Sequence, residues 1–388
     1  MYPDLSYFFH DLFGSPPDNW LSVLKTFGVF LILSFIASAY FLRRELKRKE
    51  DEGLLQGFTE KIRMGFPATW QEIAQNAFFG FIIGFKLPYI LQHFDQFKPD
   101  PASILLSAKG TWGWGILAGA ILAFLKYWDH QKRKLPKPQI REVSILPHQR
   151  TGDITILAAL SGLIGARLFS IIESEENIKA FIKNPLEQLL SGSGLAIYGG
   201  LILAFAAVYV YIKRKRMTPI HVMDAAAPAL IMGYAVGRIG CQLSGDGDWG
   251  IVNVSPVPSW WFLPDWVWSY DYPHNVLNDG IQIEGCLWQY CKHLSENVYP
   301  TPIYETFFSL IIFGILWSLR KRIRIPGMIF FLYVFLNGIE RFFIEKIRTN
   351  PDIAILGIKA TQAEYIAGLL IVIGLVGIVW LYVKRERK

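Results

Sequence analysis

Arg238 is the residue whose type and position most directly indicate chemistry. It lies inside an apolar stretch, and the chain then breaks into glycines and acids between Gly240 and Gly250. An arginine at membrane depth costs on the order of 3 kcal/mol on insertion scales, so we expect an anionic partner for it. A guanidinium facing lipid would be expelled, whereas one facing a cavity that holds a lipid phosphate would be kept. The sequence therefore predicts an anion-binding cavity around Arg238.

A second charged group occurs near the end of a later apolar stretch. Arg341, Glu345 and Arg348 are spaced i, i+4 and i+7, so they share one face of a helix. One interpretation is a local arginine–glutamate pair that neutralises charge at a helix end. The other is an anion clamp in which Glu345 orients Arg341 against a phosphate. A second arginine, Arg238, at a similar depth on another span favours the clamp.

Other polar residues are candidates for the same cavity. Arg167 could line it or could pair with an acid such as Asp224. For Asp224 itself we expect a helix N-cap or first-turn position. Tyr304 and Glu305 open a later span from the outside, so both can face the cavity.

The loop after Arg238 contains Asp246 and Asp248 within a G-x-G-x-x-G match, Gly245 to Gly250. No strand is expected before this match and no crossover unit after it, so a dinucleotide site is not indicated. Two acids without further ligands are weak evidence for a metal, and we predict no metal site. The glycines instead allow the backbone to approach a lipid headgroup closely.

The composition indicates a membrane protein. Of 388 residues, 52% are hydrophobic and 18% are charged, whereas a soluble domain carries about 25% charge. The apolar residues form blocks of roughly 18 to 24, long enough to cross ~30 Å of hydrocarbon. The net charge of +7 comes from basic clusters at the ends of these blocks, so it indicates membrane anchoring and not nucleic-acid binding. Residues 1–20 have no basic n-region, so we predict no cleavable signal peptide.

We predict an all-α polytopic integral membrane protein with about nine transmembrane helices. With the N-terminus outside and the C-terminus inside, every basic cluster lies on the cytoplasmic side. The hairpin at 76–128 could instead be re-entrant. The predicted spans are Leu21–Leu42, Asn76–Gln92, Ile104–Trp128, Asp153–Ile172, Leu195–Ile212, Pro219–Leu243, Pro302–Leu319, Pro326–Phe343 and Tyr365–Val383.

These spans divide the chain into five parts. Residues 1–50 form a periplasmic lead-in and the first helix. Residues 51–150 form a cytoplasmic segment, an additional helical hairpin and a basic linker. Residues 151–243 form core helices, 244–301 a small periplasmic head, and 302–388 the C-terminal helices and a basic tail.

The three cysteines differ in their surroundings. Cys286 and Cys291 both lie in the predicted head, where an oxidising compartment would permit a disulfide, and the sequence leaves open whether it forms. Cys241 has no evident partner and is interpreted as a small packing residue.

Taken together, these motifs resemble the signature of the prolipoprotein diacylglyceryl transferases. The resemblance is carried by Gly237-Arg-Ile-Gly240 followed by Gly245, Trp249 and Gly250. It spans most of residues 152–383, through Gly165-Ala-Arg167, Gly194–Gly200, His221–Pro228, Pro302–Glu305 and Gly338–Arg348. It implies a seven-helix core, to which the hairpin at 76–128 would be an addition.

The resemblance implies a multi-pass enzyme of the bacterial inner membrane. Such an enzyme transfers the diacylglyceryl group of phosphatidylglycerol to the lipobox cysteine thiol of a prolipoprotein signal peptide and releases glycerol phosphate, the first step of lipoprotein maturation. It needs no metal or organic cofactor. Two other functions stay open: a phosphatidylglycerol-binding inactive homologue, and a transporter of anionic substrates or lipids. Transporters often contain internal repeats, and we find no convincing repeat between the halves.

By position, Arg238 and Arg341 match the arginines that hold the phosphatidylglycerol phosphate in this family, and Glu345 and Arg348 match neighbours of the second. The predicted catalytic residues are Arg238, Arg341, Tyr198, Glu345 and Glu305. The predicted substrate-binding residues are Arg238, Arg341, Arg348, Gly199, Gly200, Gly240, Gln242, Asp246, Asp248, Tyr304 and Arg167. The pair Gly199-Gly200 permits either tight helix packing or ligand access.

Two positions depart from the family pattern. Many members have a histidine, proposed as the base, where this chain has Tyr198, and a tyrosine is neutral at pH 7 unless its pKa is strongly lowered. Either the histidine is not a universal base, or Tyr198 acts by hydrogen bonding, or Glu305 or an acid of the 244–250 loop takes the thiol proton. Many members also have asparagine where this chain has Cys241-Gln242, which leaves the headgroup contact there open.

Overall fold

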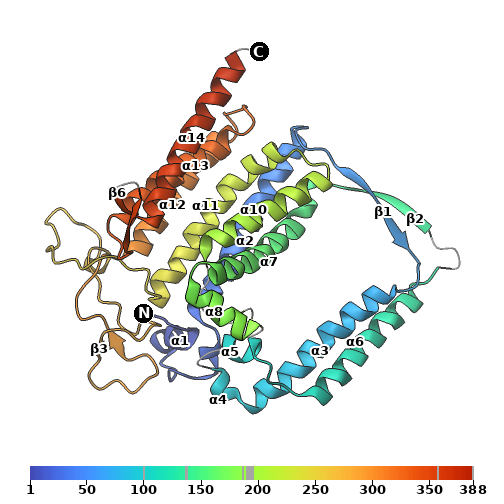
Figure 1. The fold of residues 1–388 in the computed structure, drawn as a ribbon, viewed down its shortest axis with the longest axis horizontal. Helices are drawn as coiled ribbons and strands as arrows, with labels where there is room; N and C mark the ends of the chain where they lie inside the picture. The colour runs from blue at the N-terminus through green and yellow to red at the C-terminus, as the bar shows by residue number, and fades with distance from the viewer. Residues whose placement is uncertain (99–100, 136–138, 186–187, 189–195, 356–357, 387–388) are drawn as a thin grey trace. The chain divides into compact units, whose positions relative to one another are not determined.

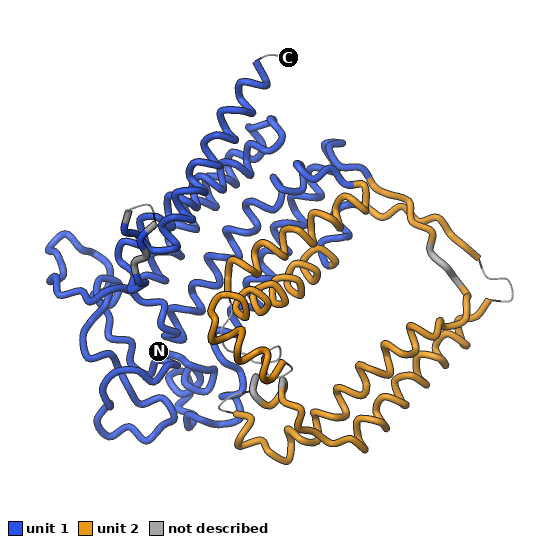
Figure 2. The backbone as a smooth tube through the Cα atoms, in the orientation of Figure 1, with its two compact units in different colours: residues 1–56, 147–152, 217–388 blue, residues 57–146, 153–216 orange. Residues whose placement is uncertain are grey.

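The computed structural model describes residues 1–98, 101–135, 139–185, 188, 196–355 and 358–386. These residues form two compact units (Figure 2). Unit 1 contains residues 1–56, 147–152 and 217–388, and unit 2 contains residues 57–146 and 153–216.

Unit 1 is built on five long helices, and its apolar core lies between three of them. The helices are α2 (Thr26–Asp51), α11 (Pro219–Ser244), α12 (Thr301–Leu319), α13 (Met328–Glu345) and α14 (Gln362–Glu386). Helix α11 packs against α2, α12 and α13, and α13 lies beside α14 (Figure 1). The core residues from α11, α12 and α13 are Ala227, Ile231, Ile312, Leu316 and Ile329.

Glycines let α2 and α11 approach closely. A Cβ on Gly233 would lie 2.0 Å from the Ser38 hydroxyl, and one on Gly240 would lie 2.6 Å from Phe30. Small residues at such contacts allow helix backbones to meet in a membrane, where dispersion replaces the hydrophobic effect as the driving force. The position of Gly240 is therefore explained by helix packing.

The head of unit 1 spans residues 245–300 and has little regular structure. It contains η3 (Asp265–Val267) and the short antiparallel pair β3 (Ile281–Gln282) and β4 (Lys292–His293). A disulfide joins Cys286 to Cys291, which answers the question that the sequence left open. The small core of the head is Tyr272, Leu294 and Val298.

The N-terminal lead-in packs on this head. It contains α1 (Leu5–Phe13) and η1 (Trp20–Val23). The backbone N–H of Tyr290 donates to the Tyr7 hydroxyl at 3.0 Å, and that of Gln289 donates to Asp18 at 2.8 Å. Further along the chain, η2 (Pro147–Arg150) lies on α2, and β5 (Asp352–Ile355) and β6 (Ile358–Thr361) form a hairpin between α13 and α14.

Unit 2 contains the additional hairpin, α3 (Trp70–Gln92) and α6 (Trp112–Lys132), joined through α4 (Phe94–Phe97) and α5 (Pro101–Leu106). Glycines allow the two long helices to touch, because a Cβ on Gly84 would lie 2.3 Å from the Trp114 carbonyl oxygen. The unit also contains α7 (Thr151–Ile172, whose first two residues are counted with unit 1), α8 (Glu175–Lys183) and α10 (Ile197–Arg214).

Strands replace parts of two segments for which we predicted other structure. Strand β1 (Phe58–Met64) lies in the predicted cytoplasmic segment at the start of residues 51–150, and β2 (Gln139–Ile145) lies in the part of that range where we predicted a basic linker. The two pair in antiparallel register from Phe58 opposite Ile145 to Met64 opposite Gln139. The pairing joins segments about eighty residues apart, which local composition does not reveal. The long elements are all helices, which is consistent with the predicted all-α polytopic fold class, and the short strand pairs are additions that we did not predict.

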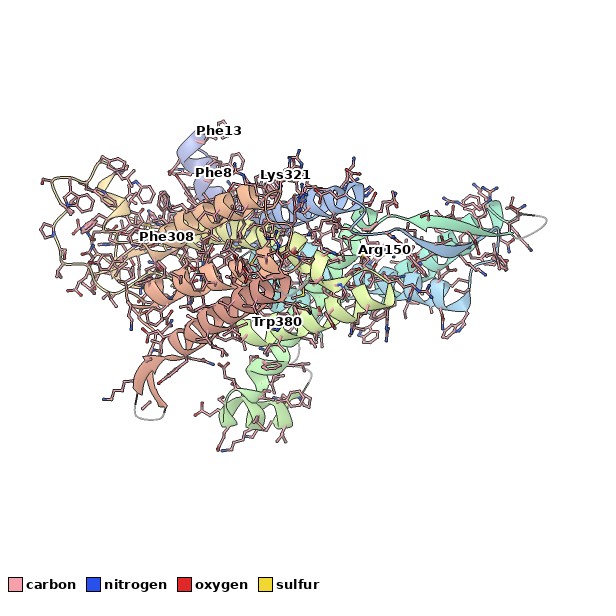
Figure 3. The ribbon with its side chains drawn as sticks, turned by 90° about the horizontal axis from the view of Figure 1, so that it is seen from above. Phe8, Phe13, Arg150, Phe308, Lys321 and Trp380 are labelled. Carbon is pink, nitrogen blue, oxygen red and sulfur yellow. A yellow bond between two sulfur atoms is a disulfide. The ribbon has the colours of Figure 1, made fainter. Side chains whose placement is uncertain are left out.

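Each of the nine predicted spans overlaps a long helix in the described part of the chain. Seven are long and apolar enough to cross a membrane: α2, α3, η2 with α7, α10, α11, α12 and α14. Helices α6 and α13 are not among these seven. Large apolar side chains such as Phe308 and Trp380 are exposed (Figure 3), as expected for helices whose outer faces meet lipid. The count of nine and the direction of the spans stay predictions.

Candidate active site

Six charged side chains of unit 1 meet where α11 ends, α12 begins and α13 ends. Arg238 comes from the last two turns of α11 and Glu305 from the first turns of α12. Arg341 and Glu345 lie in the last turns of α13, Arg348 follows that helix, and Asp248 lies in the loop after α11. We refer to these six residues as the arginine–carboxylate cluster.

Glu305 is the centre of the cluster. Its side chain is fully buried, and its carboxylate pairs with all three guanidiniums. Arg341 Nη1 lies 3.2 Å and Arg348 Nη1 lies 3.4 Å from Glu305 Oε1, while Arg238 Nε contacts Oε2. Both oxygens of this buried carboxylate are thus occupied by guanidiniums, and neither is open to an incoming thiol. Glu305 is therefore a poor candidate for the base that the sequence left open.

Asp248 bridges two of the same arginines from the loop side. It contacts Arg238 Nη1, and its Oδ1 lies 2.5 Å from Arg348 Nη2. Burial opposes ionisation of this carboxyl, but the charges of Arg238 and Arg348 outweigh burial and hold the pKa of Asp248 at about 2. The side chain is 33% exposed, so Asp248 is the accessible carboxylate of the cluster.

The loop that carries Asp248 is held on both sides. The Thr301 hydroxyl donates to the Asp248 carbonyl oxygen at 2.5 Å, and the Gly250 N–H donates to the Tyr299 carbonyl at 2.8 Å. A Cβ on Gly250 would lie 2.4 Å from the carbonyl oxygen of Ile347. Gly245 ends α11 with a φ of +62°, a left-handed conformation that favours glycine. These glycines serve loop closure and packing, and the expected access for a headgroup stays a prediction.

Glu345 holds Arg341 as the i, i+4 spacing suggested. Its Oε2 lies 2.9 Å from Arg341 Nη2. Its Oε1 accepts hydrogen bonds from Asn350 at 2.6 Å and from the Thr361 hydroxyl at 2.9 Å. The sequence does not indicate Asn350 or Thr361 as partners of Glu345, because Asn350 lies between α13 and β5 and Thr361 lies at the end of β6.

Glu340 is a further buried acid, for which the sequence indicates no role. It is 6% exposed, and neither carboxylate oxygen has a hydrogen-bond partner in the described part of the chain. Its spacing, one residue before Arg341, places it on a different side of the helix from the clamp residues.

The cluster contains three guanidiniums and three carboxylates, so it is close to electrical balance. An incoming anion must therefore displace a carboxylate from an arginine. Glu305 is fully buried and lies in a helix, whereas Asp248 is partly exposed and lies in a loop. Asp248 is the carboxylate that can leave with the least rearrangement.

A metal is poorly suited to this loop. Cys241, Asp246 and Asp248 can bring one ligand atom each within 4.8 Å of one another. However, both oxygens of Asp248 already pair with guanidiniums. Burial and the charge of Asp248 raise the pKa of the Asp246 carboxyl, which disfavours a second adjacent carboxylate anion. The geometry is that of an ion-pair network.

Two predicted substrate-binding residues are used structurally. The Tyr304 hydroxyl donates to the Val267 carbonyl at 2.8 Å, so it ties α12 to the head. A contact of Tyr304 with substrate stays a prediction. Gln242 is 3% exposed and accepts a hydrogen bond from the Tyr272 hydroxyl at 2.9 Å, which anchors the head to α11.

The remaining predicted site residues lie in unit 2. Tyr198 is in the first turn of α10. A Cβ on Gly199 would meet Phe169 at 2.2 Å, and one on Gly200 would lie 2.9 Å from the Gly162 carbonyl oxygen. The glycine pair thus permits close packing of α10 on α7. Arg167 Nη2 lies 3.4 Å from Gln188 Oε1. Gly194 and the Ser191–Gly194 turn lie outside the described residues.

Asp224 has a different role from the one we predicted. It lies in the second turn of α11 and accepts hydrogen bonds from Gly327 N at 2.8 Å and Phe330 N at 3.0 Å. It therefore caps the N-terminus of α13 and not that of its own helix. An acid that caps another helix leaves no local pattern in the sequence.

Comparison with known proteins gives a consistent result. The family model described as prolipoprotein diacylglyceryl transferase matches residues 137–380, a range that contains the whole arginine–carboxylate cluster.

The chain is similar to three proteins named phosphatidylglycerol–prolipoprotein diacylglyceryl transferase. One from Clostridium botulinum (strain Langeland) is 29% identical over 252 residues, which cover 64% of this chain and 86% of the relative. One from Dehalococcoides mccartyi is 29% identical over 295 residues, 76% and 96% of the two chains. One from Staphylococcus xylosus is 29% identical over 236 residues, 61% and 74%.

Proposed function

Because this chain belongs to the prolipoprotein diacylglyceryl transferase family, we propose that it transfers the diacylglyceryl group of phosphatidylglycerol to the lipobox cysteine of a prolipoprotein. It is a multi-pass membrane protein, and the membrane we propose is the bacterial inner membrane. The cysteine sulfur forms a thioether bond to the glyceryl carbon. The bond from that carbon to the phosphate oxygen breaks, and glycerol phosphate leaves with the electron pair.

The arginine–carboxylate cluster is the observation that carries this proposal. Negative charge grows on the phosphate as the carbon–oxygen bond breaks, and positioned guanidiniums stabilise such charge most where water is excluded. Arg238, Arg341 and Arg348 come from separate segments and meet on one buried carboxylate. Glu305 and Glu345 fix these arginines before the substrate arrives, so little reorganisation is needed at the moment of reaction.

The phosphate can bind only if guanidinium N–H groups are released from one of the carboxylates. We propose that it replaces Asp248 beside Arg238 and Arg348, while Glu305 stays in place. Once released from the two guanidiniums, the Asp248 carboxylate has a higher pKa and becomes a competent base. It can then take the proton of the attacking thiol, because the thiolate is the nucleophile. In this scheme the chain does not need a histidine at position 198.

The proposed topology places the cluster near the outer surface. With nine spans, an outside N-terminus and a cytoplasmic C-terminus, α11 and α13 both run outward. Their C-terminal ends, which carry Arg238 and Arg341, then lie on the periplasmic side with the disulfide-bonded head. This arrangement suits a prolipoprotein whose target cysteine follows its signal segment.

Purified full-length protein in detergent, supplied with phosphatidylglycerol and a lipobox peptide, tests the proposal. We expect release of glycerol phosphate and a gain of one diacylglyceryl group in the peptide mass. Arg238→Ala is expected to abolish both, and Arg385→Ala, at the exposed end of α14, is the matched control. Lipid binding without release would instead support an inactive homologue or a transporter.

Asp248→Asn tests the base separately. If the carboxylate both competes with phosphate and takes the proton, the variant has a lower KM for phosphatidylglycerol together with a lower kcat. A purely structural Asp248 predicts a higher KM. Tyr198→Phe with unchanged turnover would exclude the tyrosine hydroxyl as the base, whereas a loss comparable to that of Asp248→Asn would contradict the scheme.

A further inference from the structure

A cavity of about 330 Å³ lies in unit 1 at the far end of α11 from the arginine–carboxylate cluster. It is formed by the end of α2, the start of α11 and the segment that joins α12 to α13. Its volume is at the lower end of the range for small-molecule sites. We call it the basic cavity, after the residues that line it: Arg48, Lys49, His221, Arg320, Lys321 and Arg324.

Positive charge exceeds negative charge in this cavity. Five of its lining residues are lysine or arginine, and only Glu52 and Asp224 are acidic. Lys321, which lies at the surface (Figure 3), and Arg324 are exposed and form no ion pair with any residue in the described ranges. The cavity thus offers cations that the protein itself leaves unneutralised.

The buried cations of the cavity are fixed by partners behind them. Arg48 and Arg320 share Glu45, at 2.8 Å and 2.7 Å, and Arg320 also stacks on Trp317 with its guanidinium carbon 3.3 Å from the ring centre. Lys49 is 5% exposed, and its Nζ lies 3.6 Å from Asp224. Both oxygens of Asp224 also accept backbone hydrogen bonds at the start of α13, so the carboxylate that faces Lys49 is fixed in position.

His221 supplies a second indication of a ligand. It lines the cavity, and its Nδ1 atom is buried without a hydrogen-bond partner in the described part of the chain. Leaving a polar atom unpaired in this way costs about 1–3 kcal/mol. Because Nδ1 itself has no exposed surface, a ligand oxygen would reach it only after the imidazole ring turns toward the cavity, and that contact would then satisfy the nitrogen.

From these observations we propose that the basic cavity is a second anion site, which takes a phosphate group. Lysine and arginine with a free imidazole nitrogen suit phosphate oxygens. Apolar side chains, Leu54 and Pro326 among them, form the rest of the wall and favour the headgroup of an anionic phospholipid. Basic pockets between transmembrane helices on the cytoplasmic side hold such headgroups. Free inorganic phosphate is the other source of the same chemistry.

The test compares two charge-matched double variants of the full chain in detergent. Lys321→Gln with Arg324→Gln removes two cations from the cavity, and Lys384→Gln with Arg385→Gln removes the same two residue types from the end of α14. Native mass spectrometry counts bound phosphatidylglycerol, with phosphatidylcholine as the zwitterionic control. We expect one phosphatidylglycerol molecule to bind the cavity variant at least about tenfold more weakly than it binds the unchanged protein, a change of about 1.4 kcal/mol in binding free energy. The α14 variant is expected to bind phosphatidylglycerol as the unchanged protein does.

Inorganic phosphate is the second probe. If it raises the unfolding midpoint of the unchanged protein but not of the cavity variant, while lipid counts are equal, the natural source is soluble phosphate. Equal losses of lipid binding in both double variants would show a general surface-charge effect and would overturn the proposed site. Unchanged lipid binding in both variants would overturn it as well. His221→Phe keeps every permanent charge, and it should weaken the same binding event. Glycerol phosphate release is measured separately, so failure of this site and failure of the transferase are distinguishable.

Discussion

The arginine–carboxylate cluster and the basic cavity lie near the two ends of α11 and differ in how their charges are compensated. In the cluster, three arginines face Glu305, Glu345 and Asp248, and the central carboxylate is fully buried. In the cavity, five cations face the two lining carboxylates and Glu45 behind them, and two of the cations are exposed and form no ion pair with any residue that the structure describes.

This difference separates two uses of arginine in one unit. A balanced, buried network is rigid and admits an anion only by exchange with one of its own carboxylates, which suits a step in which charge appears during the reaction. A cavity with excess positive charge attracts an anion directly and holds it, and no carboxylate has to be displaced first. We therefore expect turnover to depend on the first and lipid occupancy on the second.

The largest effect expected is that of Arg238→Ala on turnover. Loss of one charge-stabilising donor costs about 10²–10³ in kcat, and here it also leaves Arg348 as the one arginine of the cluster that contacts both Glu305 and Asp248. The rate of glycerol phosphate release measures this, with Arg385→Ala expected to match the unchanged protein. Near-normal turnover of Arg238→Ala would remove the cluster from the reaction.

Glu305→Gln is expected to lower the free energy of unfolding by about 3 kcal/mol, since removing one partner of a buried ion network leaves uncompensated charge. Glu45→Gln, at the other end of the unit, is the comparison. Arg48 retains Glu52 at 2.7 Å in that variant, so a smaller loss is expected. Tryptophan fluorescence during denaturant unfolding measures both. A larger loss for Glu45→Gln would reverse the view that the cluster is the more tightly coupled network.

Asp248 and Asp246 should respond to pH with opposite signs. The pKa of Asp248 is lowered from 3.8 to about 2, so its contribution to stability is present above pH 3.8 and is lost as the pH falls toward 2. The pKa of Asp246 is raised, so its ionisation costs stability as the pH rises above 3.8. Asp248→Asn should therefore be less stable than the unchanged protein at neutral pH, and Asp246→Asn more stable. The unfolding midpoint across pH 2 to 7 tests this, and equal behaviour of the two variants would contradict the assignment.

The smallest effect expected on chemistry is that of Cys286→Ser with Cys291→Ser. The cysteines are five residues apart, and closing so short a loop contributes about 2 kcal/mol in the chain-entropy model. We expect the head to unfold earlier while glycerol phosphate release stays near normal. Complete loss of turnover in a folded double variant would show that the cluster depends on the head more than its own ion pairs suggest.

The sequence predicted the helices and the residues of the arginine–carboxylate cluster better than it predicted which ion pairs these residues form. The pair of Arg341 and Glu345 follows from i, i+4 spacing and is present. The threefold pairing of Glu305 depends on how α11, α12 and α13 pack, which no local pattern encodes. The pairing of Asp248 with two arginines likewise requires the closed loop.

Errors in the predictions have a common physical cause. The pairing of β1 with β2, the cap that Asp224 places on α13, and the contact of Tyr304 with the head all join segments far apart in the chain. Sequence patterns report a residue's own element and its nearest neighbours along it. They do not report which distant backbone will satisfy a polar side chain.

The cap that Asp224 places on α13 has a consequence for the register of the two arginines. The Gly327 N–H donates a hydrogen bond to Asp224. Arg238 lies 14 residues after Asp224, and Arg341 lies 14 residues after Gly327. At 1.5 Å per residue, each helix spans about 21 Å between that shared hydrogen bond and its arginine. The two arginines therefore lie the same number of residues along their helices from one shared hydrogen bond, which fixes the register of α11 against α13 at that point. A single residue inserted into either helix would shift one guanidinium by about 1.5 Å along the axis and 100° around it, while the other stays in place.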